Sequence, residues 1–264
     1  MQAMKRFYQV MGIVALTTAS GGALAADMPM KAAPMAVQRC AADQFKGGYI
    51  GVNGGAVNWT SNRTDQDQVL VDAATYVQKD WAGMVGGQFG WNGGTCNTIY
   101  GFEVDGDWIS GRNNTQLLPN AQGININIAS RWDAIVTARG RAGLVIDNML
   151  LYITGGVAAG HFKTAYTNQF FPIPNVFPGF VNTWNTDQWR YGLVAGVGAE
   201  WAFGGNWTLR SEVLYVDFIE SSHNVLSVAV PGPGFLAGFK ESDSAWIGRV
   251  GLNYRFGGAA VARY

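Results

Sequence analysis

The stretch that decides the fold of this chain reads Tyr100-Gly-Phe-Glu-Val-Asp-Gly-Asp-Trp108. Successive side chains of a β-strand point to opposite faces, so one face would be apolar, with aromatic residues at both ends. The other face carries the acids Glu103, Asp105 and Asp107. A soluble sandwich buries the apolar face, whereas a membrane barrel turns it to lipid and its charges to the lumen. The rest of the chain distinguishes the two.

Eight segments alternate between apolar and polar residues in this way, and they cover residues 48–58, 81–92, 100–108, 132–144, 150–160, 189–203, 207–217 and 246–256. The connections alternate in length: residues 59–80, 109–131, 161–188 and 218–244 are long, while 93–98, 145–149 and 204–206 are short. An even strand number with long loops on one rim is typical of outer-membrane barrels. The sequence therefore predicts an all-β, eight-stranded antiparallel up-and-down transmembrane β-barrel with short periplasmic turns and long extracellular loops.

Aromatic residues of the apolar face gather at the two ends of the segments. Next to long loops lie Trp81, Trp108, Trp132, Trp189 and Trp246, and next to short turns lie Trp91, Tyr100, Trp201, Phe203, Trp207, Tyr254 and Phe256. Trp81 and Trp91 are ten residues apart, and a tilted strand crosses the hydrocarbon in about 9–11 residues. Because aromatic rings prefer the two headgroup regions, we expect two membrane-interface girdles. The alternative is a soluble core with scattered aromatic residues.

The polar face of the segments is charged. It carries five acids and five arginines: Glu103, Asp105, Asp107, Glu200 and Glu212, and Arg139, Arg141, Arg210, Arg249 and Arg255. An eight-stranded barrel is only just wide enough for its own side chains, and an unpaired buried charge is costly. The planar guanidinium suits multiple carboxylate contacts. We therefore predict a lumen ion-pair network that plugs the barrel, with a narrow ion-conducting pore as the alternative.

The N-terminus has the features of a cleaved export signal. Lys5 and Arg6 precede an apolar stretch, and Ala23-Leu24-Ala25 is a cleavage sequence. We expect a signal peptide over residues 1–25, a periplasmic linker over 26–44, the barrel over 45–256 and a tail over 257–264. Charged residues make up 14% of the chain with a formal net charge of +0, which argues against nucleic-acid binding.

The two cysteines are expected to meet at the periplasmic rim. Cys40 precedes the first segment and Cys96 lies in the first short turn. The bacterial periplasm oxidises such pairs, so we predict a Cys40–Cys96 disulfide, with two free thiols as the alternative. Two cysteines and two histidines lack the spacing of a zinc site, and we expect no metal or other cofactor.

Two features of the long loops bear on catalysis and binding. Ser221-Ser222-His223-Asn224 is superficially like a Ser/His pair, but neighbouring strand residues face opposite ways, so we expect no enzyme. Apolar residues are concentrated around 170–180 and 230–239. Exposed apolar patches often mark interaction sites, which leaves adhesion or small-molecule binding open. A further alternative is a soluble lipocalin-like carrier. Such a barrel would be polar outside and apolar inside, the reverse of the arrangement predicted here.

Several motifs resemble a known family. These are Gly48-Tyr49-Ile50-Gly51, Gly86-Gly87-Gln88-Phe89-Gly90-Trp91-Asn92, Thr154-Gly155-Gly156-Val157-Ala158 and Gly251-Leu252-Asn253-Tyr254-Arg255-Phe256. In order and spacing they are similar to small outer-membrane barrels of alphaproteobacteria, the RopB-like surface antigens.

The resemblance implies an OmpA-like barrel in the Gram-negative outer membrane, abundant at the cell surface, with a structural or weakly porin-like role and no catalytic residues. The partners would be outer-membrane lipids, lipopolysaccharide and the barrel assembly machinery. Members commonly end at the aromatic residue of the last strand, whereas residues 257–264 follow Phe256 here. The assembly signal is therefore expected either at Tyr264 or within the chain.

Overall fold

A computed structural model describes residues 40–65, 75–111, 114–119, 124–170, 180–227 and 235–256. The expected signal peptide, most of the expected linker and the tail lie outside these ranges. Among the described residues, no helix is both long and apolar enough to cross a membrane.

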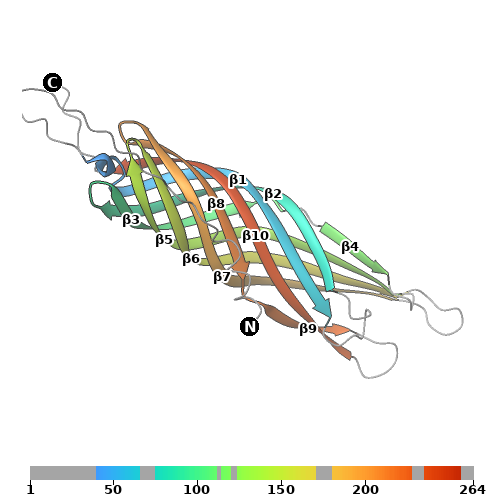
Figure 1. The fold of residues 1–264 in the computed structure, drawn as a ribbon. Coiled ribbons are helices and arrows are strands. Elements are labelled where there is room, and N and C mark those ends of the chain that lie inside the picture. Colours follow the sequence, from blue (N-terminus) through green and yellow to red (C-terminus); the bar gives the residue numbers. More distant parts are fainter. Residues whose placement is uncertain are drawn as a thin grey trace, which may run out of the picture. The chain divides into compact units, whose positions relative to one another are not determined.

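Eight strands form a closed antiparallel ring in the order β1-β2-β3-β5-β6-β7-β8-β10, and β10 pairs back with β1 (Figure 1). The predicted eight-stranded barrel is thereby confirmed. The strands of the ring are β1 (Gly47–Asp65), β2 (Thr75–Gly94), β3 (Thr98–Ile109), β5 (Ile124–Ile146), β6 (Met149–Phe170), β7 (Phe180–Gly204), β8 (Trp207–Phe218) and β10 (Phe235–Phe256). A short 3-10 helix, η2 (Ala41–Gln44), precedes them.

Two further strands lie where the sequence predicted long loops. β4 (Asn114–Pro119) pairs with the outer part of β5, and β9 (Ser221–Ser227) pairs with the outer part of β10. Most ring strands also run past the predicted ends: β7 has 25 residues, far more than the membrane needs. The apolar alternation ends where the lipid ends, so the sequence pattern did not reveal these extensions.

The connections at the opposite rim are tight turns. Asp147 (φ 53°) and Asn148 join β5 to β6, and Gly205 (φ 56°) and Asn206 join β7 to β8. Both first residues adopt the left-handed conformation of two-residue hairpin turns. The predicted alternation of long and short connections therefore holds.

The outer face of the wall is apolar, and most of the predicted girdle residues are exposed there. Exposed fractions run from 37% for Tyr254 to 68% for Trp81. The exposed girdle residues are Trp81, Trp91, Tyr100, Trp108, Trp189, Trp201, Phe203, Trp207, Trp246, Tyr254 and Phe256. An apolar exterior around a charged interior is the arrangement of a membrane barrel and excludes the lipocalin-like carrier.

The prediction for Trp132 is wrong. This side chain is only 2% exposed and lies inside the barrel. The register between β5 and β6 shifts between Trp132 and Ala134, so Asp133 is an extra residue on β5. A bulge of this kind reverses the in–out phase of the strand. Val136 still faces outward, whereas Trp132, on the far side of the bulge, faces the lumen.

Candidate functional site: the barrel lumen

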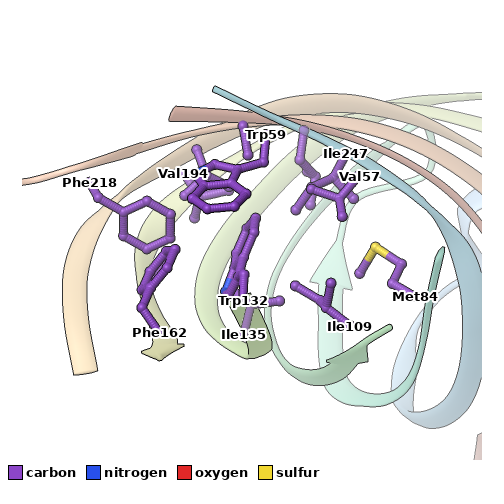
Figure 2. Packing of buried hydrophobic residues seen from close by; sticks show 14 residues of the cluster. Val57, Trp59, Met84, Ile109, Trp132, Ile135, Phe162, Val194, Phe218 and Ile247 are labelled. Carbon is purple, nitrogen blue, oxygen red and sulfur yellow. The ribbon is translucent and has the colours of Figure 1, made fainter. Parts of the chain in front are cut away.

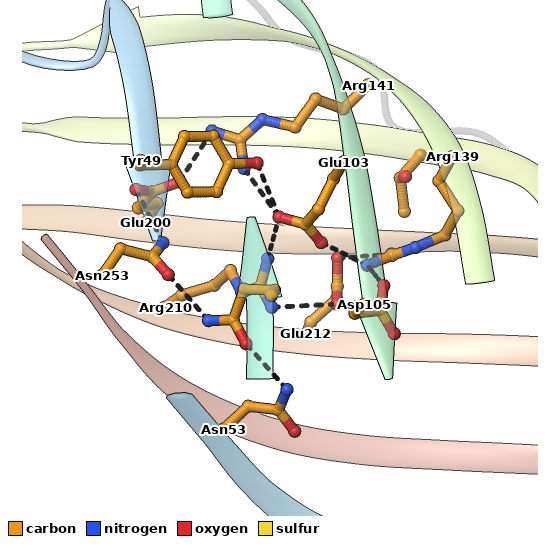
Figure 3. Close-up of polar contacts among 12 residues, drawn as sticks. Tyr49, Asn53, Glu103, Asp105, Arg139, Arg141, Glu200, Arg210, Glu212 and Asn253 are labelled. Atoms are coloured by element: carbon orange, nitrogen blue, oxygen red, sulfur yellow. Dashed lines mark hydrogen bonds and ion pairs between the residues drawn. The ribbon is translucent and has the colours of Figure 1, made fainter. Parts of the chain in front are cut away.

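The lumen contains a buried network of charges from both sides of the ring (Figure 3). Its members, called the inner network below, are Glu103, Asp105, Asp107, Arg139, Arg141, Glu200, Arg210, Glu212 and Arg249. All are at most 5% exposed. Regular strand alternation directs each of these side chains inward. Nine of the ten predicted lumen residues therefore meet in one place.

Arg139 on β5 contacts three carboxylates. Its Nη1 lies 2.8 Å from Glu212 Oε1 and its Nη2 lies 2.9 Å from Asp105 Oδ2. Nη2 also bonds to Glu103. Charge-assisted hydrogen bonds of this kind are about twice as strong as neutral ones. Arg139 thus ties β3 to β8 through the middle of the lumen.

Arg249 on β10 approaches the same acids from the opposite wall. Its Nη1 lies 2.8 Å from both Asp105 Oδ1 and Asp107 Oδ2, and its Nε donates to Glu212 Oε2 at 2.9 Å. Three ring strands separate β10 from β5 in either direction. The network therefore crosses the whole lumen.

Arg141 lies between two tyrosine rings. Its guanidinium carbon is 5.0 Å from the ring centroid of Tyr49 and 4.9 Å from that of Tyr152. It also contacts Glu200 Oε2 at 2.9 Å. These cation–π contacts add to the ion pair, and the Arg141 side chain is shielded from water. Tyr49 in turn donates to Glu103 Oε2 at 2.6 Å, and Arg210 bonds to the same carboxylate.

Neutral polar side chains complete the network, and the site prediction omitted them. Gln88 donates to Asn253 Oδ1 at 2.7 Å, and Asn53 donates to Gln88 Oε1 at 2.7 Å. The other neutral members are Tyr49, Asn92, Thr137, Tyr152 and Thr208. Gln88 and Asn253 lie on the polar face of their predicted segments, so the alternation in the sequence already assigned them to the inward face.

Arg255 is inward, as predicted, but does not share the pairing of the others. It is 2% exposed and its guanidinium lies 3.5 Å from the backbone carbonyls of Asp43 and Gly205. In the described part of the chain it forms no ion pair within 4.0 Å. Arg255 therefore belongs to the periplasmic rim.

An apolar layer of packed side chains (Figure 2) follows the inner network toward the outer ends of the strands, with Ile109 two residues beyond Asp107 on β3. Trp132 and Phe162 stack with ring centroids 5.3 Å apart, and Phe162 meets Phe218 edge-on at 5.2 Å. Trp59 reaches Phe162 from the opposite wall at 6.0 Å. The remaining members are Val57, Met84, Ile109, Ile135, Ala158, Val194, Leu214, Val216, Ala245 and Ile247. Aromatic rings from four strands thus meet across the lumen.

A second set of charges lies beyond the apolar layer. Arg63 Nε donates to Glu241 Oε1 at 2.9 Å, and Arg190 bonds to both Glu241 and Asp243. Arg190 also lies 5.0 Å from the ring centroid of Phe162. Only Arg190 among these residues lies in a predicted strand, so the alternation in the sequence does not reveal this cluster.

The chain before β1 lies across the periplasmic end. Cys40 is bonded to Cys96, which lies 56 positions further along the chain. The backbone N–H of Ala42 donates to Cys96 O at 3.0 Å. Ala42 and Phe45 are fully buried, and they pack in a cluster with Ile99, Val145, Leu150 and Tyr152.

The Ser/His pair considered as a catalytic site falls on β9, where the structure describes no side chains. In the described residues, no group of three or more His, Cys, Asp or Glu side chains is arranged to hold a metal ion.

This closed ring, apolar outside and charged within, defines a transmembrane β-barrel of the Gram-negative outer membrane. The family model for the outer membrane protein beta-barrel domain matches residues 23–256. The chain belongs to this family.

Named relatives agree with this assignment. The chain is 30% identical over 246 residues to the 31 kDa outer-membrane immunogenic proteins of Brucella melitensis biotype 1 and Brucella suis biovar 1, covering 89% of this chain and 93% of each relative. Among solved structures, the outer membrane protein OprG of Pseudomonas aeruginosa aligns with a TM-score of 0.52 and 14% identity, over 80% of this chain and 97% of that one. OprG supports the fold alone. The protein is an outer-membrane barrel related to surface antigens.

Proposed function

We propose that this protein is a structural barrel of the cell surface whose lumen is closed to ions and solutes. One observation carries the proposal: Trp59, Trp132, Phe162 and Phe218, from four strands, pack against one another across the lumen. An ion would have to displace this apolar layer, where it would lose its hydration.

The inner network adds a second barrier in series. Arg139 and Arg249 are each hydrogen-bonded to several acids, and breaking one buried pair leaves the other charges uncompensated. The cluster around Phe45 and the Cys40–Cys96 bond cover the periplasmic end. Three successive obstructions favour a plug over the alternative of a small diffusion pore.

Planar-bilayer recordings test the plug. The purified protein is expected to give no steady unit conductance, while a general porin in the same bilayers serves as the positive control. Trp59→Ala combined with Phe162→Ala removes two rings of the apolar layer, and Arg139→Ala with Arg249→Ala removes the bridging cations. Neither double variant is expected to conduct, because the other barrier remains. The fourfold variant is expected to conduct once Cys40→Ser and Cys96→Ser also release the chain that covers the periplasmic end. Regular steps from the wild type would refute the plug.

A non-catalytic surface role accords with the names of the relatives, which describe immunogenic outer-membrane proteins. Binding to a host or small-molecule ligand through the long loops is the second candidate. The apolar loop residues that would form such a site, around 171–179 and 230–234, lie outside the described part of the chain. We further propose that outer-membrane lipids and lipopolysaccharide contact the two girdles, and that the barrel assembly machinery inserts the chain.

A further inference from the structure

The outward face of β5, β6 and β7 becomes charged directly beyond the outer girdle, the ring formed by Trp81, Trp108, Trp189 and Trp246. The three strands run side by side past this ring (Figure 1). On β6, His161 lies opposite Trp189. In the next outward row, Lys163 lies between Arg131 of β5 and Asp187 of β7. Together with Asp133 of the β5 bulge, these charged and ionisable residues are called the outer charge cluster below.

Two cations of the cluster lie directly opposite each other, Arg131 on β5 and Lys163 on β6. Like charges in this position destabilise a sheet. Asp133 offsets part of the repulsion, because its Oδ2 accepts from Arg131 Nη2 at 3.0 Å and lies 3.3 Å from Lys163 Nζ. The Asp133 side chain is 7% exposed, whereas those of Arg131 and Lys163 are 39% and 43% exposed. The acid is therefore covered, and the two cations face outward.

Asp187 limits where a further anion can bind. Its Oδ1 lies 2.6 Å from His161 Nε2, and its Oδ2 lies 3.8 Å from Lys163 Nζ. Its side chain is 61% exposed, so it repels an anion that approaches from the side of β7. An anion is therefore expected over Arg131 and Lys163, on the side of β5.

Neutral side chains continue this face outward. The row beyond the cations consists of Ala129, Ala165 and Asn185, and the row beyond that consists of Asn127, Thr167 and Thr183. All of them are at least partly exposed. The two alanines leave space beside the cations, and the amides and hydroxyls can both donate and accept hydrogen bonds. With distance from the membrane, the face thus changes from aromatic to charged and then to neutral polar.

Lipopolysaccharide presents its groups in the matching order. Its acyl chains lie in the membrane, its innermost sugars carry phosphates, and further sugars follow outward. The long connections of the barrel lie on the side of the leaflet that contains it. Arginine binds phosphate through its planar fork, and lysine binds it as a point charge. A phospholipid supplies a phosphate at this depth but no sugars above it, so the polar rows favour lipopolysaccharide.

We propose that the outer charge cluster binds one phosphate group of lipopolysaccharide between Arg131 and Lys163, with the adjoining sugars against the polar rows beyond. The inference rests on the contact between lipopolysaccharide and the outer girdle proposed above. It assigns that contact to one place on the wall and to named side chains.

Native mass spectrometry of the purified protein in detergent tests the site, with bisphosphorylated lipid A as the probe. One bound molecule is expected. Arg131→Gln with Lys163→Gln should weaken binding by about tenfold or more, the size of one charge-assisted hydrogen bond. The matched control is Lys240→Gln on β10, whose side chain is 42% exposed and paired with Glu220. It makes the same change outside the cluster and should leave binding unchanged.

Two further variants act in opposite directions. Asp187→Asn removes a nearby negative charge and should strengthen binding. Ala165→Glu places an acid beside Lys163 and leaves Asp133 and its partners unaltered, so it should abolish binding. The second variant also serves if the double variant fails to fold, as judged by heat-modifiable migration on gels. Weaker binding to Asp187→Asn, or unchanged binding to Ala165→Glu, would overturn the proposal.

The chemistry of the ligand is tested with altered lipids. Lipid A without its phosphates should bind about tenfold more weakly or worse, and equal binding of the two forms would overturn the phosphate site. Phosphatidylglycerol that displaces lipid A with equal affinity would assign the site to phospholipid and overturn the proposal as well. Lipopolysaccharide with core sugars should bind more tightly than lipid A, and Thr183→Val should reduce that difference.

The outcomes separate this site from the broader proposal. Equal binding of lipid A to the wild type and to every variant would refute the cluster and leave the contact with the girdle in place. No bound lipid A in any sample would refute both. Bilayer conductance reports separately on the closed lumen.

Discussion

Trp132 and Phe162 stack inside the barrel with ring centroids 5.3 Å apart and planes 13° apart. The β5 bulge at Asp133 turns Trp132 inward, so that its ring reaches Phe162. Without the bulge, the strand phase that sets Val136 outward would have placed Trp132 in lipid as well. A single backbone irregularity therefore moves a large ring from the girdle to the centre of the apolar layer.

Replacing this ring tests its contribution to stability. Trp132→Ala should lower the free energy of unfolding by about 3–5 kcal/mol, because it leaves a cavity among packed rings. Urea unfolding in lipid vesicles measures the loss. Trp108→Ala removes a lipid-facing ring of the same kind and should cost clearly less, since lipid fills the space. Equal losses for the two variants would contradict the buried stack.

The inner network should be sensitive to removal of a bridging cation. Arg139→Met leaves Glu103, Asp105 and Glu212 with fewer partners, and should cost about 3–5 kcal/mol of unfolding free energy. The control is Arg131→Met, whose side chain is 39% exposed beside Asp133 and should cost below about 1 kcal/mol.

A rescue variant sharpens the same point. Adding Glu212→Gln to Arg139→Met should recover part of the loss, because one of the uncompensated charges disappears. The free energies come from the same vesicle unfolding. Additive losses in the double variant would mean that the two side chains do not act as a pair.

Gly198 provides space for a network residue. A Cβ atom there would lie 2.4 Å from the ring of Tyr152, whereas at Gly248 a Cβ would meet nothing within 4 Å. Gly198→Ala should therefore displace Tyr152 and cost about 1–3 kcal/mol, while Gly248→Ala should be neutral or slightly stabilising. The midpoint of thermal unfolding in detergent compares them. A neutral Gly198→Ala would show that Tyr152 packs elsewhere.

The disulfide should stabilise the periplasmic end. A cross-link between residues 56 apart is worth about 4 kcal/mol in the chain-entropy model. Reduction should lower the unfolding midpoint of the wild type but not that of the double variant Cys40→Ser, Cys96→Ser. Two thiols titrating in the unreduced, unfolded chain would speak against the bond.

The alternation of apolar and polar residues predicted the parts of the strands that lie in or near the membrane. Strand β8 was predicted within one residue of its observed end at Phe218, and Glu103, Arg139 and Arg249 were assigned to the lumen. This works because lipid on one side and a narrow lumen on the other impose a two-residue period on every strand. Beyond the girdles that difference in surroundings fades, so the outer extensions, β4 and β9 were not predicted.

The sequence by itself thus determined the number of strands in the ring, their direction through the membrane and most of the residues that face inward, because each depends only on local alternation. The tertiary structure alone decided which carboxylate Arg249 bonds, that Trp132 turns inward, and that an apolar layer separates two sets of charges. These features depend on the register between strands far apart in sequence and on one bulge. A period of two residues contains no information about either.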